Sequence, residues 1–173
     1  GRGTDILLGG NPDYLLRVIR ALRVPGDDPP LHVTVQTAGG FDWEAAAPVL
    51  AEVDGVQFDL KVADPAAHRR HTAHGPDPIL ANLRRVVALG LPVEARIPVI
   101  PGLTDDEANL RGLARLARDL GLARPTLLAY NPAGLDAYEA VGRTPPDLPR
   151  RSLDREAWAA LQARFAAWWA ETR

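Results

Sequence analysis

The 173-residue sequence contains neither cysteine nor methionine. The absence of cysteine excludes disulfides, thiolate catalysis and any zinc or iron–sulfur site with cysteine ligands built from these residues alone. Neither sign of charge is in excess, because 20 basic and 22 acidic residues give a net charge of -2, which argues against a nucleic acid or an anionic membrane as a partner. No apolar run approaches the ~18 residues of a transmembrane helix, and no signal-peptide pattern opens the chain. We therefore expect a cytoplasmic protein.

The length fits one domain with a sizeable core. Residues 1–5 lead directly into the apolar run Ile6–Leu8, without an initiator methionine. We therefore interpret residues 1–173 as a single partial domain that begins in mid-fold, as a fragment or a processed product.

Strand-like and helix-like runs alternate along the chain, which predicts a parallel sheet built from βα units. The predicted strands span residues 5–8, 31–37, 56–60, 93–100 and 126–130, and the predicted helices span residues 13–23, 43–52, 78–89, 105–120 and 154–172. Pro12 suits a first helical turn, Thr104 begins a capping box, and Gly90 and Gly121 stand where helix C-caps belong. Residues 131–151 are predicted to form a long loop at the C-terminal end of the strands.

Polar side chains occupy one face of several predicted strands, which is unusual for a parallel sheet covered on both faces. Because successive side chains of a strand point to opposite faces, residues two apart share a face. The sets are His32, Thr34 and Gln36; Gln57, Asp59 and Lys61; and Glu94 and Arg96. Such faces suit the interior of a partial barrel that holds a polar ligand at the C-terminal ends of its strands.

The charged members of this face have a functional and a structural interpretation. Arg96 could pair with a ligand carboxylate through its planar guanidinium, or form a buried ion pair with Glu94 or Asp59. Lys61 could contact a carboxylate or a ribose of a ligand, with Asp59 orienting it and keeping it charged. The alternative is a structural salt bridge between Lys61 and Asp59.

The ends of other strands carry further candidates. Gly9 and Gly10 would let the backbone approach a ligand at a strand-to-helix turn, or form an ordinary turn. Gln36 and Thr37 could contact ligand hydroxyls or cap the end of a strand. Tyr130 could flank an adenine ring or pack under the following loop.

Three histidines, His68, His71 and His74, are spaced by three residues and could place imidazoles on one helix face. No carboxylate in register completes a metal site, and the neighbouring Arg69 and Arg70 would repel a cation. We therefore expect a solvated helix face and no metal site.

Five short motifs follow one another in chain order: Gly9–Pro12, Gln36–Gly39, Asp59–Lys61, Arg96–Gly102 and Leu127–Asn131. Together they resemble the radical S-adenosylmethionine activating enzymes of glycyl radical enzymes, such as the pyruvate formate-lyase activating enzyme. The resemblance implies an α/β fold, a partial (β/α) barrel with about five βα units present and the first unit missing.

The same resemblance implies an oxidoreductase that binds S-adenosylmethionine and a 4Fe-4S cluster, cleaves S-adenosylmethionine reductively to a 5'-deoxyadenosyl radical, and abstracts hydrogen from a glycine of a partner, a glycyl radical enzyme. It implies a cofactor site formed by Gly9, Gly10, Asn11, Gln36, Thr37, Asp59, Lys61, Arg96, Tyr130 and Asn131.

The sequence departs from the family pattern at several positions. The CxxxCxxC loop that holds the family's cluster is absent from these residues, so a 4Fe-4S cluster would need a segment outside them. Asn11 replaces a glutamate that engages the ligand's amino group, and an amide without negative charge weakens such a contact. Gln36 replaces an acidic residue, and Asn131 replaces a histidine.

Three functions are compatible with these patterns. The first is the S-adenosylmethionine-binding part of an activating enzyme that is not competent without cluster cysteines, and the second is a degenerate, non-catalytic barrel that binds a ligand or a partner. The third is a barrel lyase with Lys61 as a Schiff-base nucleophile, against which Asp59 argues because a nearby carboxylate keeps the amine protonated. A missing first unit would leave the strand Ile6–Leu8 at an open edge, so we expect an oligomer or a complementing segment there.

Overall fold

The computed structural model describes residues 11–23, 26, 31–72 and 75–171. Its centre is a four-stranded parallel sheet in which neighbouring strands are also consecutive along the chain. The strands are β1 (Thr34–Thr37), β2 (Gly55–Asp59), β3 (Val93–Val99) and β4 (Thr126–Ala129). The predicted α/β class and parallel sheet are confirmed, and the predicted strand at residues 5–8 lies outside the described residues.

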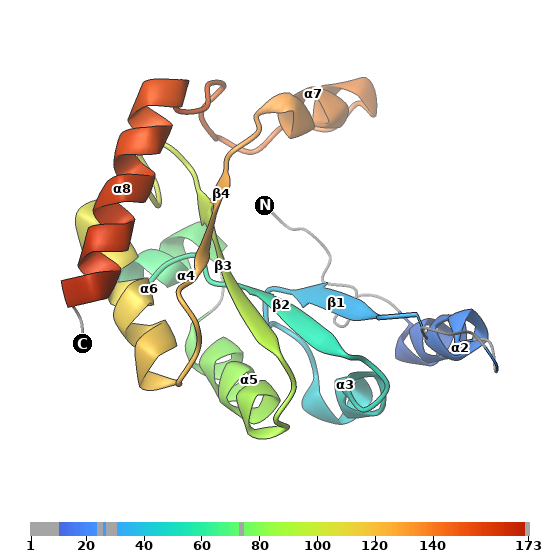
Figure 1. The fold of residues 1–173 in the computed structure, drawn as a ribbon. Coiled ribbons are helices and arrows are strands. Elements are labelled where there is room, and N and C mark those ends of the chain that lie inside the picture. Colours follow the sequence, from blue (N-terminus) through green and yellow to red (C-terminus); the bar gives the residue numbers. More distant parts are fainter. Residues whose placement is uncertain (1–10, 24–25, 27–30, 73–74, 172–173) are drawn as a thin grey trace.

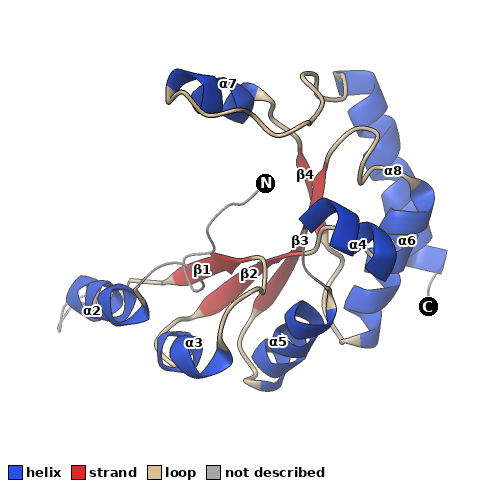
Figure 2. Cartoon of the chain, turned by 180° about the vertical axis from the view of Figure 1, so that it is seen from behind, coloured by secondary structure: helices blue, strands red, loops and turns tan. Residues whose placement is uncertain are grey.

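Seven helices are described, and four of them cover one side of the sheet. They are α2 (Pro12–Leu22), α3 (Trp43–Leu50), α4 (Pro65–Thr72), α5 (Asp77–Ala88), α6 (Glu107–Asp119), α7 (Ala133–Ala140) and α8 (Arg155–Glu171). Figures 1 and 2 show α3, α5, α6 and α8 along the outer side of the curved sheet, with α2 beyond β1 and α7 beyond β4. Within the described residues, no helix combines the length and apolar character needed to cross a bilayer.

The core lies between the sheet and these outer helices. Successive side chains of a strand point to opposite faces. In β2, Val56 and Phe58 are therefore buried, whereas Gln57 and Asp59, which alternate with them, are only half-buried. Phe58 is fully buried at the centre of the sheet. The buried hydrophobic cluster to which it belongs also includes Leu50, Leu83, Val86, Ile97, Leu110 and Leu113.

The start of α6 differs from the prediction. Asp106 is its N-cap, with Oδ1 accepting from the backbone N–H of Asn109 at 2.9 Å. The predicted capping box beginning at Thr104 is therefore wrong. The Thr104 hydroxyl instead closes the loop after β3, because it donates to the carbonyl of Pro98 at 2.8 Å and accepts from the N–H of Ile100 at 2.7 Å.

Other helix boundaries match the sequence signals. Pro12 lies in the first turn of α2. Gly90 and Gly121 have φ of +73° and +72° directly after α5 and α6, which confirms both as C-cap glycines. The segment 131–151, predicted to be a loop, contains α7, and α4 was not predicted as a separate helix.

Two aromatic residues join α8 to α6. Trp168 is buried in the core, and Trp169 lies against Arg118 of α6, whose guanidinium is 3.9 Å from the indole centroid. Arg118 Nη2 also donates to the backbone carbonyl of Trp169 at 2.5 Å. The two adjacent tryptophans therefore contact different parts of one helix pair.

Asp54, just before β2, joins three parts of the chain. Its Oδ2 accepts from the N–H of Val33 and from Arg23 Nη2, each at 2.8 Å. The hydrogen bond from Val33, aided by the positive charge of Arg23, holds the pKa of Asp54 below the ordinary value of 3.8.

Candidate functional site

A row of polar side chains crosses the sheet on the face opposite the core. The parallel register places Gln36 beside Gln57 and Gln57 beside Glu94. It also places Asp59 beside Arg96, one step closer to the C-terminal ends of the strands. Of the polar residues that sequence alternation assigned to this face, three strands thus bring together Gln36, Gln57, Asp59, Glu94 and Arg96.

Hydrogen bonds, together with an ion pair between Asp59 and Arg96, connect these side chains into one network. Gln36 Nε2 donates to Asp59 Oδ2 at 3.1 Å, and Arg96 Nη1 donates to Gln57 Oε1 at 2.5 Å. Gln57 Nε2 in turn donates to Glu94 Oε2 at 3.0 Å. Hydrogen bonds of this kind hold the side chains in place before any ligand binds.

Asp59 and Arg96 form the centre of the network. Arg96 Nε lies 3.6 Å from Asp59 Oδ1, and the two side chains are 16% and 15% exposed. The ion pair with Asp59, given above as an alternative for Arg96, is therefore present. Yet Asp59 Oδ1 and Arg96 Nε are buried without a hydrogen-bond partner in the described structure. Leaving such a group without a hydrogen bond costs about 1–3 kcal/mol.

Tyr130 adds a third atom of this kind. Register places Thr126 beside Arg96, and alternation along the chain puts Leu128 and Tyr130 on the same side as Thr126. The Tyr130 hydroxyl is buried and finds no hydrogen-bond partner among the described residues. A phenol hydroxyl both donates and accepts, so it can serve either kind of polar ligand group.

Lys61 follows β2 on the loop that leads to α4 and is half-buried. Among the described residues it forms no ion pair with Asp59, so the predicted pairing of these two side chains is wrong. Asp59 instead interacts with Arg96 and Gln36 of the neighbouring strands. The Lys61 backbone carbonyl accepts a hydrogen bond from Asn109 of α6 at 3.3 Å.

Gln36 and Thr37 lie on opposite sides of the sheet. Gln36 belongs to the polar network, whereas Thr37 is 2% exposed on the core side. The Thr37 hydroxyl accepts from the N–H of Gly39 at 3.0 Å, which matches the strand-capping alternative for this residue.

The two asparagines that replace family residues both bind local backbone. Asn11 Oδ1 accepts from the N–H of Tyr14 at 3.1 Å as the N-cap of α2. Asn131 Oδ1 accepts from the N–H of Ala133 at 3.0 Å, at the start of α7. Gly9 and Gly10 lie outside the described residues. The structure therefore brings Gln36, Asp59 and Arg96 into one network and places Asn11 and Asn131 at helix starts.

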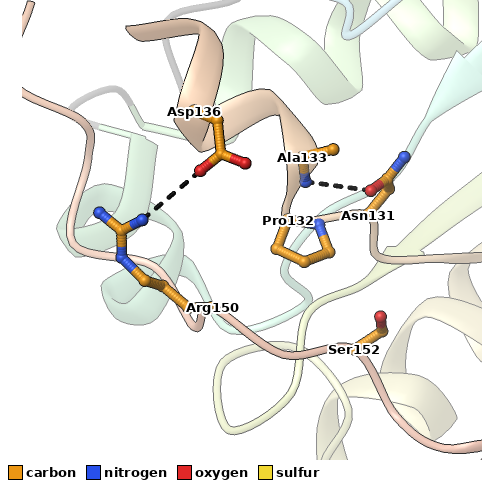
Figure 3. A pocket seen from close by; sticks show the side chains of 6 residues that line it. All are labelled: Asn131, Pro132, Ala133, Asp136, Arg150 and Ser152. Atoms are coloured by element: carbon orange, nitrogen blue, oxygen red, sulfur yellow. Dashed lines mark hydrogen bonds and ion pairs between the residues drawn. The ribbon is translucent and has the colours of Figure 1, made fainter. Parts of the chain in front are cut away.

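A surface pocket of about 410 Å³ lies beyond the end of β4. Figure 3 shows Asp136 and Arg150 pointing toward one another on one side of it and Asn131 on the other. Arg150 Nη1 lies 3.6 Å from Asp136 Oδ1, and both side chains are largely exposed. The residues that line the pocket are Asn131, Pro132, Ala133, Asp136, Arg150 and Ser152. Among the predicted site residues that are described, only Asn131 belongs to this lining.

His68 lies on α4 and is 5% exposed, so the prediction of a solvated face is wrong for this residue. Burial is a tertiary property, which spacing along the sequence does not reveal. In the part of the chain that is described, no group of three or more histidine, cysteine, aspartate or glutamate side chains could hold a metal ion.

Two buried asparagines, Asn82 and Asn109, were not predicted from the sequence. Asn82 of α5 donates through Nδ2 to the carbonyls of Gly39 and Phe41, at 2.9 and 2.8 Å, in the loop after β1. Asn109 of α6 binds the loop after β2. Their sequence signal is a single amide on an otherwise apolar helix face, beside Leu83 and Leu110 respectively.

A parallel βα sheet with helices on one side and a polar face on the other is typical of a barrel-type α/β protein. Residues 1–114 match the radical SAM superfamily, and the chain belongs to that family. The isethionate sulfite-lyase activating enzyme of Nitratidesulfovibrio vulgaris is 36% identical over 154 residues, which are 88% of this chain and 47% of that protein. The pyruvate formate-lyase 2-activating enzyme of Escherichia coli is 28% identical over 142 residues, which are 82% of this chain and 47% of that protein. The predicted resemblance to activating enzymes is therefore confirmed.

The fold has a counterpart among solved structures. A domain of a pyruvate-formate lyase-activating enzyme from Bacteroides vulgatus superposes with a TM-score of 0.64 at 21% identity, covering 95% of this chain and 90% of that domain. This likeness confirms the partial barrel. The chain spans about half the length of the curated relatives it matches.

The family implies S-adenosylmethionine and a 4Fe-4S cluster, and the two groups fit these residues differently. The 173 residues include no cysteine, so they do not supply thiolate ligands for the cluster. The unsatisfied atoms of Asp59, Arg96 and Tyr130 match the donors and acceptors of S-adenosylmethionine, which carries a carboxylate, an ammonium and ribose hydroxyls.

Proposed function

We propose that this chain is the S-adenosylmethionine-binding part of a radical SAM activating enzyme whose partner is a glycyl radical enzyme. The observation that carries the proposal is the set of buried atoms without a hydrogen-bond partner on the polar face: Asp59 Oδ1 and Arg96 Nε, which form an ion pair with each other, and Tyr130 Oη. The membership of the chain in the radical SAM superfamily and the activating enzymes among its relatives support it.

Each of these side chains has a role that suits its chemistry. Arg96 binds the carboxylate of the methionine moiety, because a guanidinium offers several donors and remains charged. Asp59, held by Gln36 and Arg96, accepts from the ligand's ammonium or a ribose hydroxyl. Lys61 contacts a ribose or carboxylate oxygen, and Tyr130 lies beside the adenine.

In the whole protein, bound S-adenosylmethionine supplies a radical when it is cleaved reductively. The chain's own residues bind and orient the ligand, and the side of the sheet that packs against helices keeps their backbone rigid. Cluster ligands are proposed to come from residues outside these 173, because no cysteine is among them.

Calorimetric titration of the chain with S-adenosylmethionine tests the ligand site. Arg96→Met should weaken binding at least tenfold, since a charge-assisted hydrogen bond contributes about 1.5–3 kcal/mol. Arg20→Met is the matched control, because Arg20 forms an ion pair with Glu52 at 2.8 Å outside the site. The proposal fails if the unchanged chain shows no binding, or if both variants bind like the unchanged chain.

A second candidate is a non-catalytic relative that binds S-adenosylmethionine or a partner without turnover. The observation in its favour is that the Oδ1 atoms of Asn11 and Asn131 are already engaged by backbone N–H groups. Reconstitution of the whole protein with iron and sulfide separates the two candidates. Formation of 5'-deoxyadenosine under a reductant supports the activating enzyme, and binding without this product supports the non-catalytic relative.

A further inference from the structure

The loop that carries Lys61 is held by a side chain from a different βα unit. Asn109 lies in the first turn of α6 and is 7% exposed. Its Oδ1 accepts from the N–H of Ala63 at 2.7 Å, and its Nδ2 donates to the Lys61 carbonyl at 3.3 Å. One buried amide therefore binds the backbone on both sides of Val62.

The same amide also binds the next loop along the sheet. Asn109 Nδ2 donates to the carbonyl of Thr104 at 2.9 Å, in the loop that follows β3. That loop is closed by the Thr104 hydroxyl, which bonds back to Pro98 and Ile100 at the end of β3. Asn109 thus joins the loop of Lys61 to the strand that carries Arg96.

Gly112 brings α6 and this loop close together. It lies three residues after Asn109, and positions three apart share a helix face. A Cβ at Gly112 would lie 2.6 Å from the Cβ of Ala63, a separation that real Cβ atoms essentially never show. Glycine is a poor helix former in a helix interior, and here its lack of a side chain makes room for Ala63.

We infer that Asn109 and Gly112 are positioning residues for the ligand site, and that they act by setting where Lys61 stands relative to Arg96. The inference rests on the proposed function, because it needs Lys61 to contact S-adenosylmethionine. In this proposal neither Asn109 nor Gly112 contacts the ligand. Each fixes the Lys61 backbone from the core side of the sheet.

Asn109→Asp and Gly112→Ala perturb this arrangement in different ways. Asn109→Asp keeps the shape and the acceptor for Ala63 but loses the donor to the carbonyls of Lys61 and Thr104. We expect about fivefold weaker S-adenosylmethionine binding in calorimetry, the equivalent of one neutral hydrogen bond. Gly112→Ala leaves the amide intact and displaces Ala63, so we expect a loss of binding here as well.

A Lys61→Met background shows whether the effect passes through Lys61. Lys61→Met alone should weaken binding about tenfold by removing a charged contact. In that background Asn109→Asp and Gly112→Ala should cause no further loss of affinity, because the Lys61 ammonium that Asn109 and Gly112 position is absent. A merely structural role would instead give the same loss in both backgrounds.

Asn82→Asp is the matched control. Asn82 is a buried helix asparagine that binds the loop after β1 rather than the loop of Lys61. Its effect on binding should be the same with Lys61 and with Met at that position. Circular dichroism checks that each variant is folded. If Asn109→Asp does not fold, the affinities of Gly112→Ala in the two backgrounds test the inference.

The outcomes separate this inference from the proposed function. Unchanged affinity in both positioning variants, or losses that persist fully in the Lys61→Met background, would overturn the inference while the ligand site stands. Absence of binding by the unchanged chain would overturn both.

Discussion

Substitution of Gly39 by alanine should destabilise the fold through two separable effects. Gly39 has φ of +80°, and the left-handed conformation costs a residue with a Cβ about 1–2 kcal/mol. A Cβ here would also lie 2.3 Å from Phe58 Cζ and 2.9 Å from Ile79 Cγ2. Phe58 is fully buried, so it has little room to move, and overpacking of a core costs about 1–3 kcal/mol. We therefore expect Gly39→Ala to lower the free energy of unfolding by about 2–5 kcal/mol.

Gly102 provides the matched control for the backbone effect. Its φ is +74°, and a Cβ built on it would meet no atom within 4 Å. Gly102→Ala should therefore cost only about 1–2 kcal/mol. The difference between the two alanine variants measures the contact with Phe58 and Ile79.

A second substitution tests the origin of that difference. Phe58→Leu removes Cζ, the ring atom that a Cβ at position 39 would strike. In the Phe58→Leu background, the gap between the Gly39 and Gly102 variants should shrink, although the backbone cost remains. Urea unfolding followed by circular dichroism gives each free energy. Equal destabilisation by Gly39→Ala and Gly102→Ala would refute the reasoning, because it would mean that the loop after β1 does not pack on Phe58.

Two further predictions concern surface contacts. Hydrogen bonds from Val33 and Arg23 lower the pKa of Asp54, so its contribution to stability is full above pH 3.8 and is lost as the pH falls through the lowered value. Asp54→Asn should accordingly be less stable than the unchanged chain at neutral pH, and urea unfolding at a series of pH values should show the gap closing in acid. Arg118→Met should cost about 1–2 kcal/mol in the free energy of unfolding, because it removes the cation–π contact with Trp169 and the hydrogen bond to the Trp169 carbonyl. Arg118→Lys should keep the charge but lose the planar stacking, so a full rescue by lysine would contradict the stacking argument.

The alternation of polar and apolar residues was enough to predict the two faces of the sheet. Gln57 and Asp59 lie on the polar face, and Val56 and Phe58 lie in the core, as a period of two requires. This success is local in origin, because each strand carries its own pattern of burial. Most helices were predicted for the same reason, with ends marked by residues such as Pro12.

The partners of each polar side chain were not predictable from one strand. The sequence pointed to a pairing of Asp59 with Lys61, which are two residues apart along the chain. Residues two apart along a strand are separated by about 6.6 Å, whereas adjacent strands lie about 4.8 Å apart. Asp59 therefore pairs with Arg96 and Gln36 across the sheet. Register between strands is a tertiary property, and a strand's own sequence does not contain it.

Short helices and buried amides were missed for a related reason. The eight-residue helices α4 and α7 are too short to show a clear hydrophobic period, although each begins with a readable signal. Asp64 Oδ1 accepts from the N–H of Ala67 at the start of α4, and Asn131 does the same for Ala133 near α7. Asn109 is recognisable only through the loops that it contacts, which come from residues 61–63 and 104.

Buried polar side chains in this structure fall into two groups according to whether their hydrogen-bonding atoms are satisfied. The amides of Asn82 and Asn109 lie on the core side and bind backbone carbonyls of loops, which is what a scaffold requires. Asp59, Arg96 and Tyr130 lie on the other side, and each retains a buried atom without a hydrogen-bond partner in the described residues, as do Arg23 and Arg118 away from this face. Unsatisfied polar atoms destabilise a fold unless something else binds them. The polar face keeps three of them together, next to loops held by satisfied amides, and this grouping supports the ligand site proposed for it.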